Sequence, residues 1–268
     1  MDNYLQANQH LWNEWTPLHE QSPLYKVAEF KAGASTLRPV ERAELKDVAG
    51  KTLLHLQCHF GLDTLSWARA GAIVTGVDLS DRSIALARSL STELNIPATF
   101  VCADLLDLPT ALSGQFEIVF TSYGVLHWLR DLKRWAEVIA HFLKPGGIFY
   151  IVEFHPFSRV FDSDSSELKV AHPYSFSEEP FRFEMQGSYA AEATTPLHGY
   201  NWNHSLGEVF NAQIGVGLRI EFFNEFSFTL RERIAGMVQG EDGLWRLTRQ
   251  HGMIPLLFSL QARKAGKD

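Results

Sequence analysis

The fold is decided by the stretch TLLHLQCHFGLDTLSWARAGAIVTGVDLS, which occupies residues 52–80. It contains an apolar run at 52–57, a helix-period segment at 62–70 and a second apolar run at 72–78. A strand, a helix and a strand in this order are typical of a βαβ unit, which feeds a parallel sheet. Gly71 is placed to end the helical segment as a left-handed stop. The stretch therefore predicts an α/β fold.

The alternation of helices and strands continues along the chain. A helix is expected at 81–94, with Ser80 as its N-cap. Further strands are expected at 98–102, 116–122, 147–154, 218–226 and 254–262, and further helices at 132–143 and 205–214. The pattern breaks at 155–204, which is rich in serine, glutamate, proline and aromatic residues and has one strand-like run at 181–185. Because a structureless loop of that length is unusual, we expect an insertion there.

Composition limits the kinds of partner. The chain has 268 residues, with 24 Lys and Arg against 31 Asp and Glu, and a formal charge of −7. With no block of basic residues, no nucleic-acid partner is expected, since affinity for a phosphate backbone comes mostly from neutralised charge. The first residues lack the features of a secretory signal, and no run approaches the ~18 apolar residues of a membrane span. We therefore expect a cytoplasmic protein with no membrane partner.

Cysteine and histidine usage argues against a disulfide scaffold and against a metal site. The two cysteines, Cys58 and Cys102, are too few for a disulfide framework, and we expect both to be reduced. His172, His198 and His204 lie in the insertion without the spacing of a zinc-ligand set. No metal is expected.

An acidic residue at the end of the second strand suggests a nucleotide-type site. Asp78 follows Gln57 by 21 residues, close to the ~20-residue offset at which a carboxylate holds ribose hydroxyls. Asp104 lies just past the third strand, where a carboxylate can accept a hydrogen bond from an adenine amino group. The turn at 57–61 keeps only Gly61, so on spacing alone an ordinary turn with a solvated Asp78 stays an alternative.

Further motifs carry a resemblance to a known family. With CADL at 102–105, TSYGVLHW at 121–128 and KPGG at 144–147, the chain resembles the class I S-adenosylmethionine (SAM)-dependent methyltransferases. It is most similar to the small-molecule group of the ubiquinone-biosynthesis type, and within it to a bacterial subgroup of unassigned substrate. The resemblance covers 51–154 well and 205–262 more loosely. It implies a doubly wound, Rossmann-like, seven-stranded sheet of order 3-2-1-4-5-7-6 with the last strand antiparallel.

The resemblance also implies a cofactor site for SAM, whose product is S-adenosylhomocysteine (SAH), in the core at 51–154. The methionine part would face Gln57, Cys58, His59 and Gly61, the ribose Asp78, the adenine Leu79, Ala103, Asp104 and Leu105, and the sulfonium Thr121 and Ser122. The sequence departs from the family at three positions, with His55 in place of an acidic residue and Gln57 and His59 in place of glycines. These departures leave open a SAM-binding or regulatory protein without turnover.

Methyl transfer from a sulfonium is an in-line displacement that mainly needs an aligned acceptor and the exclusion of water. A base assists when the acceptor is a hydroxyl or a protonated amine. His127, Tyr123 and His155 are the catalytic candidates, since they follow the carboxyl ends of the fourth and fifth strands; the alternative for each is a structural role in the pocket wall. We predict a SAM-dependent methyltransferase acting on a small, apolar or aromatic molecule. An NAD-type oxidoreductase is disfavoured because G-x-G-x-x-G is absent.

The segments outside the core at 51–154 have predicted roles of their own. The N-terminal segment 1–50 is expected to be helical, and Trp12, Trp15 and Phe30 either close over the cofactor as a lid or pack on the sheet edge. The insertion 155–204 leaves from the end of the fifth strand, so we expect it to cover the acceptor pocket, with a homodimer contact as the alternative. The segment 205–268 is expected to complete the sheet with a helix and two strands.

Overall fold

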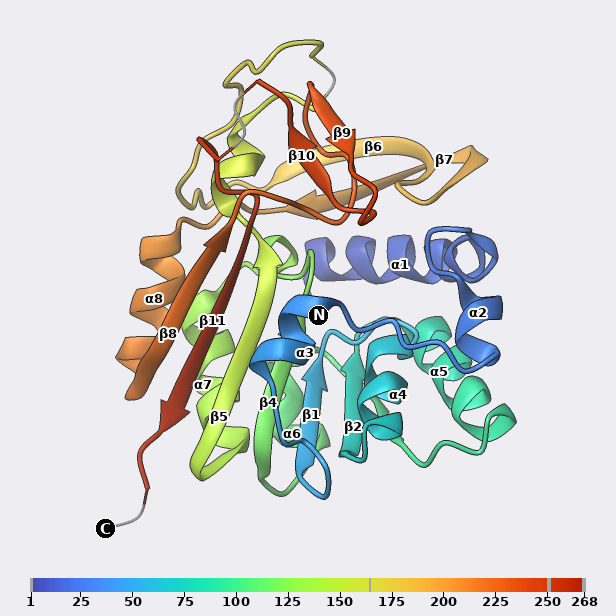
Figure 1. The fold of residues 1–268 in the computed structure, drawn as a ribbon, viewed down its shortest axis with the longest axis vertical. Helices are drawn as coiled ribbons and strands as arrows, with labels where there is room; N and C mark the ends of the chain where they lie inside the picture. Colours follow the sequence, from blue (N-terminus) through green and yellow to red (C-terminus); the bar gives the residue numbers. More distant parts are fainter. Residues whose placement is uncertain (1, 164, 250–251, 267–268) are drawn as a thin grey trace.

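The computed structural model describes residues 2–163, 165–249 and 252–266. Its centre is a seven-stranded sheet of order β3-β2-β1-β4-β5-β11-β8 (Figure 1). The strands span Thr52–Leu56 (β1), Ile73–Asp78 (β2), Thr99–Cys102 (β3), Phe116–Ser122 (β4), Leu143–Phe154 (β5), Leu218–Phe226 (β8) and Leu257–Lys264 (β11). Strands β1 to β5 are parallel, and β11 runs antiparallel to both β5 and β8. The predicted fold and strand order are therefore confirmed.

Helices cover both faces of the sheet because its central strands are apolar on both sides. Alternate residues of a strand point to opposite faces. In β1, Leu54 lies in one apolar core with α7 (Leu132–Phe142) and α8 (Leu206–Gly215). Its neighbour Leu53 lies in another core, with Trp67 of α4 (Leu62–Arg69) and with residues next to α3 (Pro39–Glu44). Strands buried on both faces are what a parallel sheet requires.

The helix that follows β2 begins where the sequence predicts. Helix α5 spans Asp81–Glu93, and the Ser80 hydroxyl accepts a hydrogen bond of 3.0 Å from the backbone N–H of Ser83. The Ser80 cap is therefore confirmed. The other helices are α2 (Val27–Lys31), α6 (Leu108–Ala111), η1 (Leu105–Asp107), η2 (Leu126–Trp128) and η3 (Pro156–Val160).

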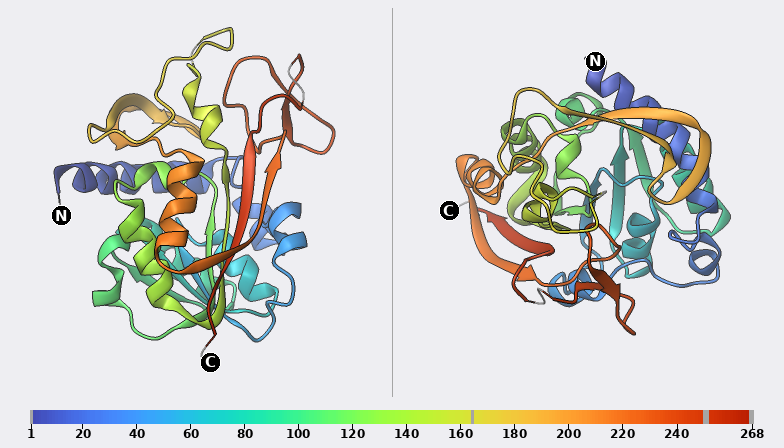
Figure 2. Two further views of the ribbon diagram at one scale, coloured as in Figure 1. Left: turned by 90° about the vertical axis from the view of Figure 1, so that its left-hand side faces the viewer. Right: turned by 90° about the horizontal axis from the view of Figure 1, so that it is seen from above.

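A separate layer lies over the carboxyl ends of the strands (Figures 1 and 2). It contains the long helix α1 (Asn3–Gln21) and the hairpin of β6 (Phe181–Ser188) and β7 (Ala191–Asn201) from the insertion. A second hairpin, β9 (Met237–Gln239) with β10 (Trp245–Leu247), lies beside it. Nothing in the sequence predicted β9 and β10, because strands of three residues are too short to show an alternating pattern.

Bonds between the N-terminus and the insertion hold this layer together. The Trp15 indole N–H donates to the Gly187 carbonyl at 2.8 Å, and the Ser22 hydroxyl donates to the Ala190 carbonyl at 2.6 Å.

Cys58 and Cys102 are both free, as expected. Within the described ranges, no helix is both long and apolar enough to cross a membrane.

Candidate active site

A cavity of about 320 Å³ lies at the carboxyl ends of β1, β2 and β4, within the size range of small-molecule sites. It is lined by most of the residues predicted for the cofactor, namely Gln57, Cys58, His59, Gly61, Asp78, Leu79, Ala103, Asp104, Leu105 and Ser122. Two catalytic candidates, Tyr123 and His127, also line it. Thr121 and His155 are not among its lining residues.

The turn after β1 has the backbone shape of a glycine-rich turn, although two of its three left-handed positions are not glycine. Gln57, His59 and Gly61 have φ angles of 55°, 53° and 80°, in the left-handed region that favours glycine. Gly61 is fixed by space as well, since a Cβ there would lie 2.7 Å from the Phe100 ring. The side chains of Gln57 and His59 are thus held in a conformation that costs about 1 kcal/mol or more each.

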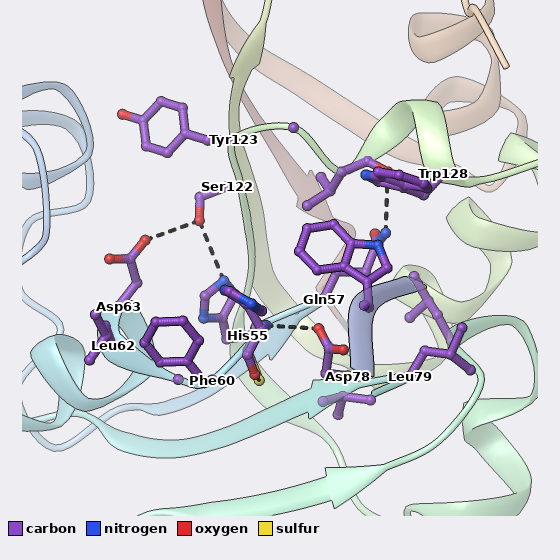
Figure 3. Close-up of a pocket in the computed structure, with 18 of the residues that line it drawn as sticks. His55, Gln57, Phe60, Leu62, Asp63, Asp78, Leu79, Ser122, Tyr123 and Trp128 are labelled. Atoms are coloured by element: carbon purple, nitrogen blue, oxygen red, sulfur yellow. Dashed lines mark hydrogen bonds between the residues drawn. The ribbon is translucent and has the colours of Figure 1, made fainter. Parts of the chain in front are cut away.

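Asp78 ties this turn to the end of β2. Its carboxylate accepts a hydrogen bond of 2.7 Å from the backbone N–H of His59 (Figure 3). It accepts another, of 2.9 Å, from the backbone N–H of Ser80. Desolvation raises the pKa of Asp78 to about 6. Leu79 continues the wall, and on the far side the Asp104 carboxylate accepts from the Leu106 N–H at 3.0 Å.

A second carboxylate, Asp63 at the start of α4, lies at the other end of the cavity (Figure 3). It accepts hydrogen bonds from the hydroxyls of Thr36, at 2.5 Å, and Ser122, at 3.3 Å. Arg38 lines the cavity too, and its charge lowers the pKa of Asp63 against the larger raising effect of burial. This end of the cavity thus carries a carboxylate and a guanidinium together.

His55 lies beside Asp63 but supplies no charge. Its Nδ1 is 2.8 Å from the Thr64 hydroxyl, and its Nε2 is 3.4 Å from the Ser122 hydroxyl. Burial lowers the pKa of His55 to about 3, so the ring is neutral at pH 7. The acidic side chain at this end is therefore Asp63, eight residues after the position at which the family resemblance expects one.

Aromatic rings from α1 and η2 form the roof. The ring of Trp12 lies 5.1 Å from that of His59 and 5.3 Å from that of Trp128, both edge to face. His19 and His59 are in contact through ring nitrogens 3.3 Å apart. Burial lowers the pKa of His19 to about 3 and that of His59 well below its usual range, so the roof is uncharged here. Of the three aromatic residues considered for a lid, Trp12 lines the cavity, whereas Trp15 and Phe30 are buried in the apolar cores.

The catalytic candidates differ in what their polar atoms contact. The Tyr123 hydroxyl donates to the buried Glu41 carboxylate at 2.7 Å. Burial, together with the positive charges of Arg159, Arg233 and Arg231, lowers the pKa of His127 well below its usual range. His127 is therefore a neutral imidazole at the cavity wall, and the same burial and positive charges make it a weaker base than a free imidazole.

His155 and Thr121 point elsewhere. His155 is buried, with Nε2 2.9 Å from a carboxylate oxygen of Glu225 on β8 and Nδ1 accepting from the Phe157 N–H at 3.1 Å. Both ring nitrogens are thus occupied away from the cavity. Thr121 is fully buried inside β4, and its hydroxyl has no hydrogen-bond partner among the described residues.

Comparison with known proteins identifies the family. A family model described as "Methyltransferase domain" matches residues 54–151, which carry β1 to β5 and the first turn. Residues 54–151 therefore form a methyltransferase domain, in agreement with the predicted resemblance to the class I SAM-dependent methyltransferases. It is 30% identical over 150 residues to the ubiquinone biosynthesis O-methyltransferase of Chromobacterium violaceum, over 55% of this chain and 59% of that protein. It is 25% identical over 197 residues to the enzyme of that name from Bordetella bronchiseptica, over 70% and 79% of the two chains.

Solved structures agree on the methyltransferase fold. A SAM-dependent methyltransferase from Mesorhizobium loti is 21% identical, with a TM-score of 0.54 over 87% of this chain and all of that one. The glycopeptide N-methyltransferase MtfA in complex with SAM is 16% identical, with a TM-score of 0.53 over 84% and 92%. These two structures confirm the predicted fold.

Several residues that line the site of this methyltransferase fold were not predicted. Asn8 comes from α1, Arg38 from the segment before α3, Asp63 from α4, and Leu230 and Arg231 from the segment after β8. Sequence offsets within 51–154 gave no signal for residues that reach the cavity from other parts of the chain. Asp63 does lie inside that range, but an acidic residue in the first turn of a helix is also favoured by the helix dipole alone.

Proposed function

We propose that this chain transfers a methyl group from SAM to a small molecule and releases SAH. The observation that carries the proposal is Asp78: its carboxylate ends β2, binds the backbone of the left-handed turn and lines the same cavity as that turn. A ligand with a ribose and an amino-acid end fits such a site. The match covers 59% of the length of the Chromobacterium violaceum enzyme. We therefore infer the activity from the site as well as from the family.

The cavity offers a complementary group for each part of SAM. Asp78 would accept the ribose hydroxyls, and Leu79, Ala103, Asp104 and Leu105 would enclose the adenine. Asp63 and Arg38 would hold the ammonium and carboxylate of the methionine end, because they bring opposite charges to one end of the cavity. The departure at His55 is therefore compensated by Asp63, and the departures at Gln57 and His59 leave the shape of the turn intact.

SAM would supply an electrophilic methyl group, and the chain's own residues would align the acceptor and exclude water. The roof of Trp12 and Trp128 would close the cavity above the turn. His127, which lines the cavity, would accept the proton of a hydroxyl or protonated amine acceptor. Tyr123, whose hydroxyl is already bonded to Glu41, would act as part of the wall.

Two experiments distinguish a methyltransferase from a SAM-binding protein without turnover. Calorimetry should show binding of both SAM and SAH, and incubation of the protein and SAM with a metabolite panel should release SAH above the rate without acceptor. Binding of SAM and SAH without release of SAH in the presence of any metabolite would favour the regulatory protein. NADH titration under the same conditions should show no binding, since the chain lacks G-x-G-x-x-G.

We also propose a cytoplasmic location and coverage of the acceptor end by 155–204, with a homodimer contact of this segment as the alternative that light scattering tests. Coverage is supported by Tyr189, an insertion residue that lines the cavity. A dimer contact is supported by exposed apolar side chains in the insertion, Val170 at 68% and Phe181 at 52% exposure.

A further inference from the structure

Three arginines gather at the end of the cavity near His127. Arg231 lines the cavity itself, while Arg159 and Arg233 line a neighbouring cavity of about 210 Å³. Phe154 joins the two spaces, because its ring lies 5.7 Å from the Arg231 guanidinium and 4.2 Å from that of Arg233. Arg231 also lies 4.4 Å from the ring of Tyr189. The guanidiniums of Arg231 and Arg233 therefore both lie against Phe154, a residue of the cavity wall.

These charges have little compensation within the protein. No ion pair joins Arg231 or Arg233 to a carboxylate in the described part of the chain, and Nε and Nη1 of Arg233 are enclosed without a hydrogen-bond partner. Arg159 donates to the neutral side-chain oxygens of Asn201, at 3.0 Å, and Asn203, at 2.9 Å.

The carboxylate of Glu153 attracts Arg159 and Arg233, but it is already engaged. It accepts hydrogen bonds from the backbone N–H groups of Gly124, Val125 and Leu126. This one carboxylate thus offsets only part of the charge of Arg159 and Arg233.

Such an arrangement of like charges is electrostatically unfavourable by itself. Burial and the repulsion of Arg231 and Arg159 lower the pKa of Arg233 well below its usual range. The contacts with Phe154 and Tyr189 are attractive, but a ring face does not neutralise a cation. Buried charges are normally paired, and unpaired donors of a guanidinium are well suited to two parallel bonds with a carboxylate or a phosphate.

We propose that Arg231 and Arg233 bind an anionic group, a carboxylate or a phosphate, on the methyl acceptor. The acceptor is then a small organic acid whose apolar body lies against Phe154 and the aromatic roof and whose reacting atom lies within reach of His127. This assignment rests on the proposed function, since it concerns the acceptor end of the same site. Arg159, fixed by Asn201 and Asn203, adds positive potential behind the two binding residues.

Calorimetry on the full chain saturated with SAH tests the assignment. The probes are benzoate, phenyl phosphate and the neutral benzamide, and the proteins are the wild type, the double variant Arg231→Gln/Arg233→Gln and the control Arg219→Gln. Arg219 is exposed on β8 and paired with Glu221, and it does not line either cavity. In the wild type and control, at least one anionic probe should bind at least tenfold more tightly than benzamide, and the better of the two identifies the carboxylate or the phosphate. The double variant should lose this preference while keeping the wild-type affinity for SAH.

Equal affinity for the three probes, binding of none of them, or a preference that survives in the double variant would overturn the assignment. Failure of the wild type to bind SAH would instead count against the proposed function. A stability measurement guards against a variant that fails to fold: unpaired cations should make the ligand-free double variant at least as resistant to urea as the wild type. Arginines that serve only packing would make it less resistant, which would also refute the proposal.

Discussion

Replacing Asp78 with alanine tests the assignment that carries the proposed function. The Asp78 carboxylate accepts two backbone N–H groups, from His59 and Ser80, besides the two ribose hydroxyls it would hold. Loss of a charged acceptor should weaken SAM binding by about 1–3 kcal/mol, which is roughly a 5- to 150-fold rise in Kd. The same change leaves two N–H groups without their acceptor, so the free energy of unfolding should fall by about 2–4 kcal/mol.

The two effects are measured separately, by calorimetry with SAM and by urea denaturation without it. Asp107→Ala serves as the control, because Asp107 is exposed and does not line the cavity. It should leave the Kd within about twofold of the wild-type value. A folded Asp78→Ala protein with an unchanged Kd would refute the ribose assignment, and unchanged stability would contradict the bonds from Asp78 to the turn.

Three further predictions concern titration and catalysis. The pKa of Asp78 lies near 6 in the ligand-free protein and ribose donors favour the charged form, so SAM affinity should rise as pH increases from 5 to 7, and Asp78→Asn should abolish this dependence. His127→Ala should reduce turnover on an identified acceptor with an ionisable proton by about 100-fold or more with little change in SAM affinity; equal turnover would leave His127 a wall residue. Burial raises the pKa of Glu41 to about 7 from an ordinary 4.5, which favours the protonated form in the folded state, so its contribution to stability should decline as pH rises from 4.5 to 7. Urea denaturation should therefore show that the free energy of unfolding of Glu41→Gln rises relative to that of the wild type between pH 4.5 and 7. A constant difference between the two proteins over this range would contradict a raised pKa of Glu41.

The core of the fold could be predicted because its signals are local. Strands buried on both faces read as continuous apolar runs, as in β1 and β4, and caps such as Ser80 mark the beginnings of helices. The family motifs then supplied the strand order, which periodicity alone does not fix. Short strands such as β9 and β10 carry no such signal.

The site could be predicted only in part, because position after a strand does not fix direction. Ser122 and Tyr123 follow β4 into the cavity, whereas His155 follows β5 and turns toward Glu225 on β8. Strand β5 lies between β4 and β11, so residues beyond its end are shared between the cavity side and the β8 side of the sheet. The left-handed backbone at Gln57 and His59 could not be predicted from these two residue types either, since neither glutamine nor histidine favours that conformation as glycine does.

The cavity joins residues from nearly the whole length of the chain, from Leu5 in α1 to Arg231 after β8. Contacts between such distant positions form late in folding and, on the ribosome, only after the last of them has been synthesised. A nascent chain that has emerged only as far as β5 already holds the turn and Asp78, but it lacks Tyr189 and Arg231 from the acceptor end. Synthesis thus delivers the turn and Asp78 before the end of the cavity that carries Tyr189 and Arg231, so an unfinished chain holds only part of the cavity wall.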